Sequence, residues 1–574
     1  MKISYTIIYI AVFIESGTYC RLKAVMFYLN SYRVAAEGCN VLIKEEGMLK
    51  RYSLLFLLLI ALSGCSKDTK EPLQNRGEVS VIEKSDKDEL NIVTFATDPP
   101  AADPLHAFDP DSYELISQIF DPLVYFGYDG NIEYGLATEW KKLSPTTIQF
   151  RLRKGVTFHN GEPFNAQSVK GTFELQADPA TKSPTQGILN SIKSVDIIDD
   201  YTVNINTFYP DGMLLYRMHM FGSIVPPQYI KEKGLDYFYN HPVGTGPFKF
   251  VAWNRGKNII LEKNTNYWKS GVPRMKRVIF NVLGQDSWVE NLIGGSIDFC
   301  MYLSGKDALL IEKNQGTRIM KRLVLSSYWV LMKNSGPLAD IRVRKALNMA
   351  VNREELIKYA EYGNGEPMAS LGKKGEFGYN AGLIPYEYDV DKAKQLLNDA
   401  GYGNGFALKV LVSDISRRVA ENMKMQFKDI DVTLNLEIVS RPDWAMRIPQ
   451  AKMTTGKADF DGDMTINLVD NPIYNLGFHA FIFLHSTGPF SITSDKDLDK
   501  KIEWAIATDV AEEHEERLQE LDKYIHDNAF IVSTYQRILT PGMQQNVFIP
   551  KINLNAHLDY NMLQEAVKEQ VKIQ

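Results

Sequence analysis

The sequence is short of the residues that build thiolate sites, and it lacks common motifs of hydrolytic enzymes. Four of its 574 residues are cysteine, too few for a zinc or iron–sulfur site made of several thiolates. The nine histidines form no H-E-x-x-H or other tight ligand pair, and no G-x-S-x-G nucleophile elbow occurs. We therefore expect a protein that is not an enzyme and has no metal site and no cofactor.

Strong charge of either sign is also missing. The formal net charge of -6 is modest for this length and argues against a nucleic-acid partner. A composition of 45% hydrophobic and 23% charged residues is typical of a globular protein, and the length predicts two or more lobes. The 29 tyrosines and 7 tryptophans suit a cleft that binds a ligand.

The most informative feature present is a short apolar run that ends in a cysteine. Lys50 and Arg51 precede the apolar residues 54–62, and Ser-Gly-Cys follows, ending at Cys65. A basic region, a run of this length and small residues describe a secretory signal peptide, which is too short to span a membrane. The cysteine after Leu-Ser-Gly resembles the bacterial lipobox, in which it receives a diacylglycerol and begins the mature protein. Cys65 is the predicted lipidation site; the alternative is an ordinary signal peptide with a chance cysteine.

This signal peptide begins unusually far from the first residue. Met48 lies just before the basic pair, and residues 44–47 can be back-translated to codons that contain a ribosome-binding sequence. We expect Met48 to be the true start and residues 1–47 to be translated upstream DNA; a genuine N-terminal extension is the alternative. Residues 48–64 would be the signal peptide, and the polar, charged residues 65–88 a flexible tether.

The remaining sequence has a mixed α/β pattern. Residues 148–152 and 203–205 alternate between apolar and polar side chains, as in half-buried strands. Apolar residues in 343–350 recur at the i, i+3, i+4, i+7 spacing of one helix face. Residues 393–400 repeat that spacing, and Gly401 follows as a stop signal.

Five segments of the sequence resemble the motifs of one protein family. They are F-H-N-G-E-P-F-N-A-Q-S-V at 158–169, P-V-G-T-G-P-F at 242–248 with L-x-x-N-x-x-Y-W after it, G-S-I-D at 295–298, P-L-A-D-I-R-V-R-K-A-L at 337–347 and Y-D-V-D-K-A-K-Q-L-L-N-D-A-G-Y at 388–402. Together they resemble the family-5 extracellular solute-binding proteins of ABC importers, the peptide- and nickel-binding group. Asn160, Asn165 and Ser168 depart from the family's usual Asp, Thr and Asp. The order and spacing of the motifs carry the resemblance.

The resemblance implies a two-lobe α/β clamp of the periplasmic-binding-protein type, with mixed sheets flanked by helices and an extra subdomain in lobe I. Lobe I would comprise residues 89–324 and 521–574, with the subdomain at about 125–235, and lobe II would comprise residues 325–520. A ligand that contacts both lobes would stabilise the closed form.

The resemblance also implies a function. The protein would be a lipoprotein that captures an oligopeptide or dipeptide outside the cytoplasm and delivers it to the permease subunits of an ABC importer. We expect a monomer that is anchored to a membrane by its lipid, on the periplasmic or cell-surface side. The alternatives on the same fold are a nickel-chelate, haem or signal-peptide binder, or an extracytoplasmic sensor or chaperone without a role in transport.

One candidate ligand residue follows from the family's peptide binders, in which an Asp of lobe II pairs with the α-amino group of the peptide. An alignment without gaps from Phe460 puts Asp470 at that position, although Asn467 replaces the usual Trp. A carboxylate facing an ammonium offsets the desolvation of both groups. An alignment on Asp463 instead shifts the register and leaves Asp470 as a turn residue before Pro472.

Tyr328 and Trp329 are the other candidate ligand residues. In the family the strand that follows them crosses between the lobes, and its aromatic side chains often line the cleft. Their rings would stack on ligand side chains or amide planes. The alternative is that they pack against the hinge.

The lipidation hypothesis predicts that Cys65→Ala releases the protein from the membrane. The acyl chains would be the only membrane contact of an exported body, so the variant loses the buried hydrocarbon that holds it. Fractionation after a salt wash measures this release. A variant that still sediments completely with membranes has another anchor, and this result would contradict the prediction.

Overall fold

A computed structural model describes most of the chain beyond the tether. The described residues are 31–36, 39–44, 88–107, 109–128, 130–455, 461–508, 510–560 and 562–569. Residues 1–80 form a unit of their own, in which the antiparallel hairpin of β1 (Ser31–Ala36) and β2 (Cys39–Lys44) is described. The predicted signal peptide and Cys65 lie outside the described residues. The unit of residues 81–574 contains the binding fold.

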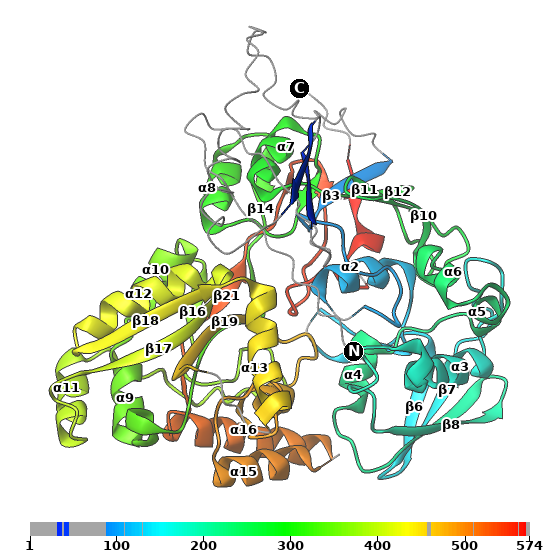
Figure 1. Cartoon of the computed structure of the whole chain (residues 1–574). Helices are drawn as coiled ribbons and strands as arrows, with labels where there is room; N and C mark the ends of the chain where they lie inside the picture. The colour runs from blue at the N-terminus through cyan, green and yellow to red at the C-terminus, as the bar shows by residue number, and fades with distance from the viewer. Residues whose placement is uncertain are drawn as a thin grey trace, which may run out of the picture. The chain divides into compact units, whose positions relative to one another are not determined.

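A mixed seven-stranded sheet forms the body of the first lobe (Figure 1). In spatial order its strands are β10 (Phe248–Asn254), β11 (Asn258–Lys263), β12 (Arg277–Asn281), β3 (Glu89–Val93), β13 (Phe299–Cys300), β22 (Gly542–Gln544) and β14 (Thr317–Ile319). Its helices are α2 (Pro110–Ile119), α5 (Pro227–Lys233), α6 (Leu235–Asn240), α7 (Trp288–Gly294) and α8 (Gly305–Lys313). Buried residues of α2, α5 and α6 share one apolar core with this sheet, and those of α7 and α8 form another.

A four-stranded antiparallel sheet forms the core of a subdomain of the first lobe. Its strands, in spatial order, are β6 (Ala137–Ser144), β7 (Thr147–Leu152), β9 (Thr202–Thr207) and β8 (Ile192–Asp199). The hairpin of β4 (Val124–Phe126) and β5 (Ile132–Tyr134), α3 (Ala166–Ala177) and α4 (Leu214–Phe221) complete it. The predicted strands at 148–152 and 203–205 are confirmed as β7 and β9.

The second lobe is built on another mixed sheet (Figure 1). Its strands are β16 (Gly365–Pro367), β21 (Tyr535–Leu539), β15 (Arg322–Met332), β19 (Met464–Asp470), β17 (Phe406–Ser413) and β18 (Val432–Val439), with β20 (Ile531–Val532) also paired to β15. One face carries α9 (Ile341–Met349), α10 (Arg353–Glu361), α11 (Val390–Asp399) and α12 (Arg417–Lys428). The other carries α13 (Arg441–Thr455), α14 (Leu476–Leu484), α15 (Lys496–Ile506) and α16 (Ala511–Asp527). Helices thus cover both faces.

Short elements connect these parts. They are the 3-10 turns at Pro179–Thr181, Gln285–Ser287, Gly336–Ala339, Asp414–Ser416 and Leu563–Glu565, and the small pair β23 (Val547–Phe548) and β24 (Val567–Lys568). Among the described residues, none of the helices combines the length and the apolar character that crossing a membrane requires.

Local signals explain why the helices of the second lobe begin and end where they do. The Asp340 side chain accepts a hydrogen bond from the backbone N–H of Arg342 at 2.8 Å and so caps α9. Asn352 caps α10 in the same way. Gly401, with φ at +87°, follows α11 in the left-handed conformation that glycine adopts at little cost. The helices predicted at 343–350 and 393–400 are confirmed.

A buried carboxylate explains both parts of one family motif, the G-T-G-P-F turn and the Y-W pair that follows it. Asp121, which is 2% exposed, accepts hydrogen bonds from Thr245 Oγ1 at 2.8 Å, from Tyr267 Oη at 3.0 Å and from Trp268 Nε1 at 3.0 Å. Burial raises the pKa of Asp121, and these three donors lower it again in part. The G-T-G-P-F and Y-W motifs are therefore tied to one acceptor at the end of α2.

Close packing explains the glycines around Thr245. A Cβ at Gly244 or at Gly246 would collide with the backbone of Ile119, at the end of α2. Neither glycine has a positive φ. The constraint that requires glycine here is therefore the close approach of the turn to the helix, not a left-handed backbone conformation.

Strand pairing bears on the boundary between the lobes. β21 pairs with β15 in the second sheet, whereas β22 pairs with β13 and β14 in the first. The chain therefore contributes to the second sheet beyond residue 521, where sequence analysis places the return to lobe I. We propose a later return, near residue 540.

The three hydrogen bonds that Asp121 accepts predict that the variant Asp121→Ala is much less stable. One buried donor and two partly buried donors would lose their acceptor, and an unsatisfied buried donor costs about 1–3 kcal/mol. We expect the free energy of unfolding to fall by about 3 kcal/mol or more, as measured by urea denaturation. Asp286→Ala, at an exposed position, is the control and should change it by less than about 0.5 kcal/mol. Equal unfolding midpoints for the two variants would contradict the prediction.

Candidate functional site

Asp470 lies at the end of a central strand of the second lobe. It is the last residue of β19 and is paired with Ser326 of β15. Its backbone carbonyl accepts a hydrogen bond from His479 Nε2 at 3.1 Å, which joins it to α14. Its side chain is partly exposed. The backbone of Asp470 is therefore held by regular structure on both sides, while its side chain stays partly exposed.

A partly buried arginine of the second lobe lies near Asp470. Arg537 Nε donates to Glu361 Oε1 at 3.1 Å, and the guanidinium lies 5.9 Å from the centre of the Tyr328 ring. Burial lowers the pKa of Arg537, but the charges of Glu361, Tyr328 and Asp470 raise it above its ordinary value. Arg537 is therefore a cation whose charge is already balanced largely by Glu361.

Polar groups of the first lobe lie near the same carboxylate. Tyr302 Oη donates to Glu114 Oε1 and lies 3.1 Å from His557 Nδ1. Burial lowers the pKa of His557, but the hydrogen bond to Glu114 and the charge of Asp470 raise it above its ordinary value. The charge of Asp470 also contributes to the raised pKa of Tyr302, behind burial and Glu114.

We name these residues, which are linked by hydrogen bonds or by the influence of the Asp470 charge, the interlobe polar cluster. It consists of Glu114, Tyr302, Asp470, Arg537 and His557. Glu114 Oε2 is buried and has no hydrogen-bond partner among the described residues. A buried acceptor without a partner is unfavourable, so Glu114 retains the capacity to accept one more hydrogen bond.

The start of α2 adds a further acidic group to this region. Burial, together with the charges of Glu114 and Asp109, raises the pKa of Asp111 to about 7, whereas the charges of His557 and Arg441 lower it. Arg441 begins α13 in the second lobe. The first-lobe side of the site therefore carries a carboxyl group that titrates near neutral pH.

A buried network supports Asp470 from behind. Lys373 is fully buried, and its Nζ lies 3.4 Å from His479 Nδ1 and 4.4 Å from the centre of the Trp329 ring. Burial, and then the charge of Lys373, lower the pKa of His479 well below its ordinary value. His479 is therefore neutral: its Nδ1 accepts from Lys373, and its Nε2 donates to the Asp470 carbonyl.

The two aromatic residues predicted to bind ligand point to opposite faces of β15, as neighbours on a strand do. Tyr328, 7% exposed, packs beside Arg537 and against the Tyr535 ring at 5.5 Å. Trp329, 2% exposed, meets the rings of His479 at 4.6 Å and Phe483 at 4.9 Å. Tyr328 thus belongs to the surroundings of the cluster, whereas Trp329 is packed in the core beneath it. Ligand contact by either ring stays a prediction.

Sequence analysis missed four members of the cluster. Glu114, Tyr302, Arg537 and His557 come from distant segments and share no motif, and only the fold brings them near Asp470. The stretch around His557, N-A-H-L-D-Y, is rich in polar and aromatic residues for a chain end. That composition was the one available signal.

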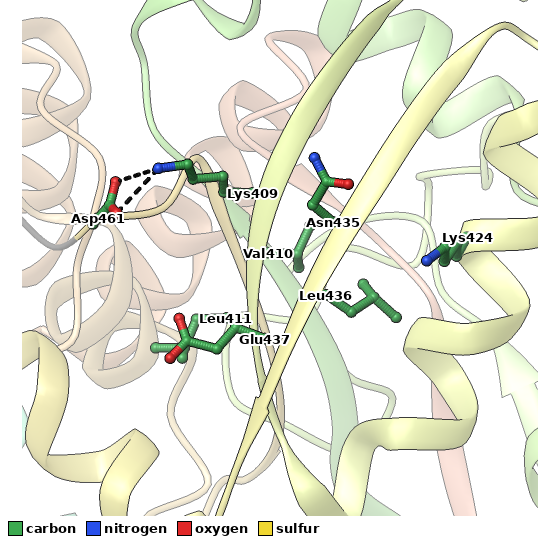
Figure 2. A pocket seen from close by; sticks show the side chains of 8 residues that line it. All are labelled: Lys409, Val410, Leu411, Lys424, Asn435, Leu436, Glu437 and Asp461. Carbon is green, nitrogen blue, oxygen red and sulfur yellow. Dashed lines mark hydrogen bonds and ion pairs between the residues drawn. The ribbon is translucent and has the colours of Figure 1, made fainter.

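A shallow pocket elsewhere on the second lobe is a weaker candidate (Figure 2). It measures about 470 Å³, and its lining includes Lys409, Lys424, Glu437 and Asp461. Lys409 Nζ donates to Asp461 at 2.9 Å and 3.0 Å, so two of its charges already satisfy each other. The pocket is lined by β17, β18 and neighbouring side chains of the second lobe. It does not combine groups from both lobes, as the interlobe polar cluster does.

Comparison with known proteins identifies the family. The family model described as bacterial extracellular solute-binding proteins, family 5 Middle, matches residues 131–474. The chain belongs to this family. The resemblance of the five motifs is confirmed, and so is the two-lobe α/β fold. Members of family 5 are binding proteins for solutes, and the relatives found are named as binding proteins rather than enzymes.

Curated relatives of this family 5 protein are named for different ligands. It is 28% identical over 341 residues to the glutathione-binding protein GsiB of Pectobacterium atrosepticum, a match that covers 58% of this chain and 66% of that protein. It is 27% identical over 450 residues to the heme-binding protein A of Haemophilus influenzae, which covers 72% of this chain and 81% of that protein. The chain spans less than two thirds of the length of the glutathione-binding relatives.

Solved structures agree on the fold. The periplasmic binding protein DppA of Helicobacter pylori, in complex with the peptide STSA, superposes with a TM-score of 0.70 at 25% identity, covering 84% of this chain and 98% of that one. NikA of Brucella suis, in complex with Fe(III)-EDTA, has a TM-score of 0.74 at 20% identity, covering 84% and 100%. The second likeness supports the fold alone.

The raised pKa of Asp111 predicts a pH-dependent stability. An unfolded Asp titrates near pH 4, whereas Asp111 in the folded protein titrates at about 7. The folded state thus binds the extra proton between these values, and the contribution of Asp111 to stability falls as the pH rises from about 4 to about 7. Asp111→Asn should therefore melt at a higher temperature than the unchanged protein at pH 8, and the difference should be smaller at pH 5.

A matched control is Asp391→Asn. Asp391 also lies in the first turn of a helix, α11, but it is exposed. Its substitution should leave the difference in melting temperature between pH 5 and pH 8 unchanged. An Asp111→Asn variant that is less stable than the unchanged protein at pH 8 would show that the site favours the carboxylate, and would contradict the prediction.

Proposed function

We propose that this family 5 protein is the substrate-binding component of an ABC importer. It captures an oligopeptide or dipeptide by closing its two lobes and delivers it to a membrane permease. It acts as a monomer outside the cytoplasm, on the periplasmic or cell-surface side, anchored through a lipid on Cys65. Closure follows because a ligand held by both lobes stabilises the closed state by its differential affinity.

The observation that carries this proposal is the pair of carboxylates in the interlobe polar cluster. Asp470 of the second lobe is partly exposed, and Glu114 of the first lobe has a buried oxygen without a partner among the described residues. A ligand ammonium, with three donors and a positive charge, suits such acceptors. Asp470 is the proposed partner of the peptide α-amino group, and Tyr328 and Trp329 are proposed to contribute aromatic surface beside it.

The ligands in the names of the relatives support this class. The DppA structure contains a four-residue peptide, STSA, and glutathione is itself a short peptide with a free amino group. A haem or a nickel chelate, which the other relatives favour, has no ammonium group to pair with Asp470. A sensor or chaperone without transport remains compatible with the same site, and permease genes next to this one would favour transport.

The decisive variant is Asp470→Asn. Removing one partner of a buried, hydrogen-bonded charge pair costs about 2–5 kcal/mol, so affinity for a peptide with a free amino group should fall by tens-fold or more. Titration calorimetry measures this loss. N-acetylated peptides should bind the unchanged protein weakly and lose little further in the variant, because the ammonium is already absent.

Asp461→Asn is the matched control. Asp461 precedes β19 in the sequence, whereas Asp470 ends that strand. It is exposed and pairs with Lys409, so its substitution should leave peptide affinity unchanged. Equal affinity of Asp470→Asn and the unchanged protein for a free-amine peptide would remove Asp470 from the site. Mass spectrometry of the ligand released from purified protein would then distinguish haem, chelate and peptide.

A further inference from the structure

A cavity other than the pocket of Figure 2 lies within the unit of residues 81–574. Residues of both lobes line it. It measures about 560 Å³, within the range of roughly 300–1,000 Å³ of small-molecule sites. The first-lobe subdomain contributes residues between 187 and 217, and the second lobe contributes α14 and α15. Its apolar lining includes Ile188, Met213, Phe478, Phe481, Ile482 and Ile506.

The sequence of α14 explains the apolar wall. The helix reads L-G-F-H-A-F-I-F-L, apolar on nearly every side, and such a helix is expected to be covered all round. One side, including Phe483, packs into the core of the second lobe. Phe478 packs against the core of the first-lobe subdomain. Phe481 and Ile482 are only partly buried, and these two side chains face the cavity.

Arg217 supplies the polar end of the same cavity. It is 9% exposed, and it donates through Nη1 to the Ile188 carbonyl at 2.7 Å and through Nη2 to Ser191 Oγ at 3.2 Å. It also pairs with Asp211. Its Nε is buried and has no hydrogen-bond partner among the described residues. A donor in this position lacks the acceptor that buried polar groups normally have.

We propose that this cavity is a second binding site, which takes a compact apolar group that carries a hydrogen-bond acceptor. The apolar part lies against α14 and α15, and the acceptor lies at the Arg217 end of the cavity. An aromatic or branched aliphatic group suits the volume. Because the walls come from both lobes, an occupant stabilises the lobe arrangement that forms them.

This site is distinct from the interlobe polar cluster. None of the five residues of the cluster is among the residues that line the cavity. Two sources can supply the same chemistry: an apolar side chain of the captured ligand, or a separate small molecule. The first source rests on the proposed function, and the second is independent of it.

Asp211 and Glu503 also line the cavity, so a probe without negative charge is required. The test uses the neutral dye 6-propionyl-2-(dimethylamino)naphthalene, which joins apolar rings to a carbonyl acceptor. We expect saturable binding of one dye per protein, with an increase in fluorescence. Ile482→Trp and Ile506→Trp enlarge side chains that line the cavity and should each weaken binding at least tenfold. Val251→Trp, at an exposed position of β10, is the matched control and should leave it unchanged.

The melting temperature of each variant verifies that it is folded. Dye binding that is absent, or that persists undiminished in both folded cavity variants, overturns the proposal. A third variant, Met213→Trp, fills the cavity from the first lobe and should act like the other two. An effect confined to the second-lobe variants would also overturn the proposal, because the site requires both walls.

Competition with peptides distinguishes the two sources. If a ligand side chain is the occupant, a free-amine peptide with a phenylalanine displaces the dye, its alanine counterpart does not, and Asp470→Asn weakens the displacement. If a separate molecule is the occupant, both peptides leave the dye bound. In the second outcome the cavity is still a binding site, whether or not the peptide proposal for Asp470 succeeds.

Discussion

The second lobe depends on one buried strand. β15 pairs with β19 along most of its length and with β20 and β21 on its other side. At its start it also reaches the first lobe: Arg322 Nη2 donates to the Tyr128 carbonyl at 2.9 Å, and the backbone N–H of Leu325 donates to Leu554. The strand that organises the second sheet is therefore also the strand that meets the other lobe, so the position of Asp470 beside it is set by backbone pairing.

Buried charge is the second constraint, and two parts of the molecule satisfy it differently. Asp121 is surrounded by donors from the family motifs and has a structural role. In the interlobe polar cluster, by contrast, Arg537 has Glu361 as a partner, whereas Glu114 retains an oxygen without one among the described residues. The difference separates a carboxylate with several donors from the fold from one with an unused acceptor oxygen, which we propose as part of the ligand site, since a buried polar group without a partner is unfavourable.

Much of the fold could be predicted from local signals. The cap residues Asp340 and Asn352 and the stop at Gly401 mark helix ends because they satisfy backbone groups within a few residues. The strands 148–152 and 203–205 follow from alternation. The functions of Gly244 and Gly246 could not be predicted in the same way, because the helix that they approach lies more than a hundred residues earlier in the chain.

The sequence by itself determined the family, the α/β class and the candidate Asp470, because motif order and periodic burial are properties of neighbouring residues. Only the tertiary structure decided what surrounds Asp470. Arg537 comes near it through long-range strand pairing, and Tyr302 and His557 through the packing of segments distant in sequence. Trp329 is turned into the core because successive side chains on a strand face opposite ways. A ligand site between two lobes is a property of contacts distant in sequence, and no local pattern records which residues will meet there.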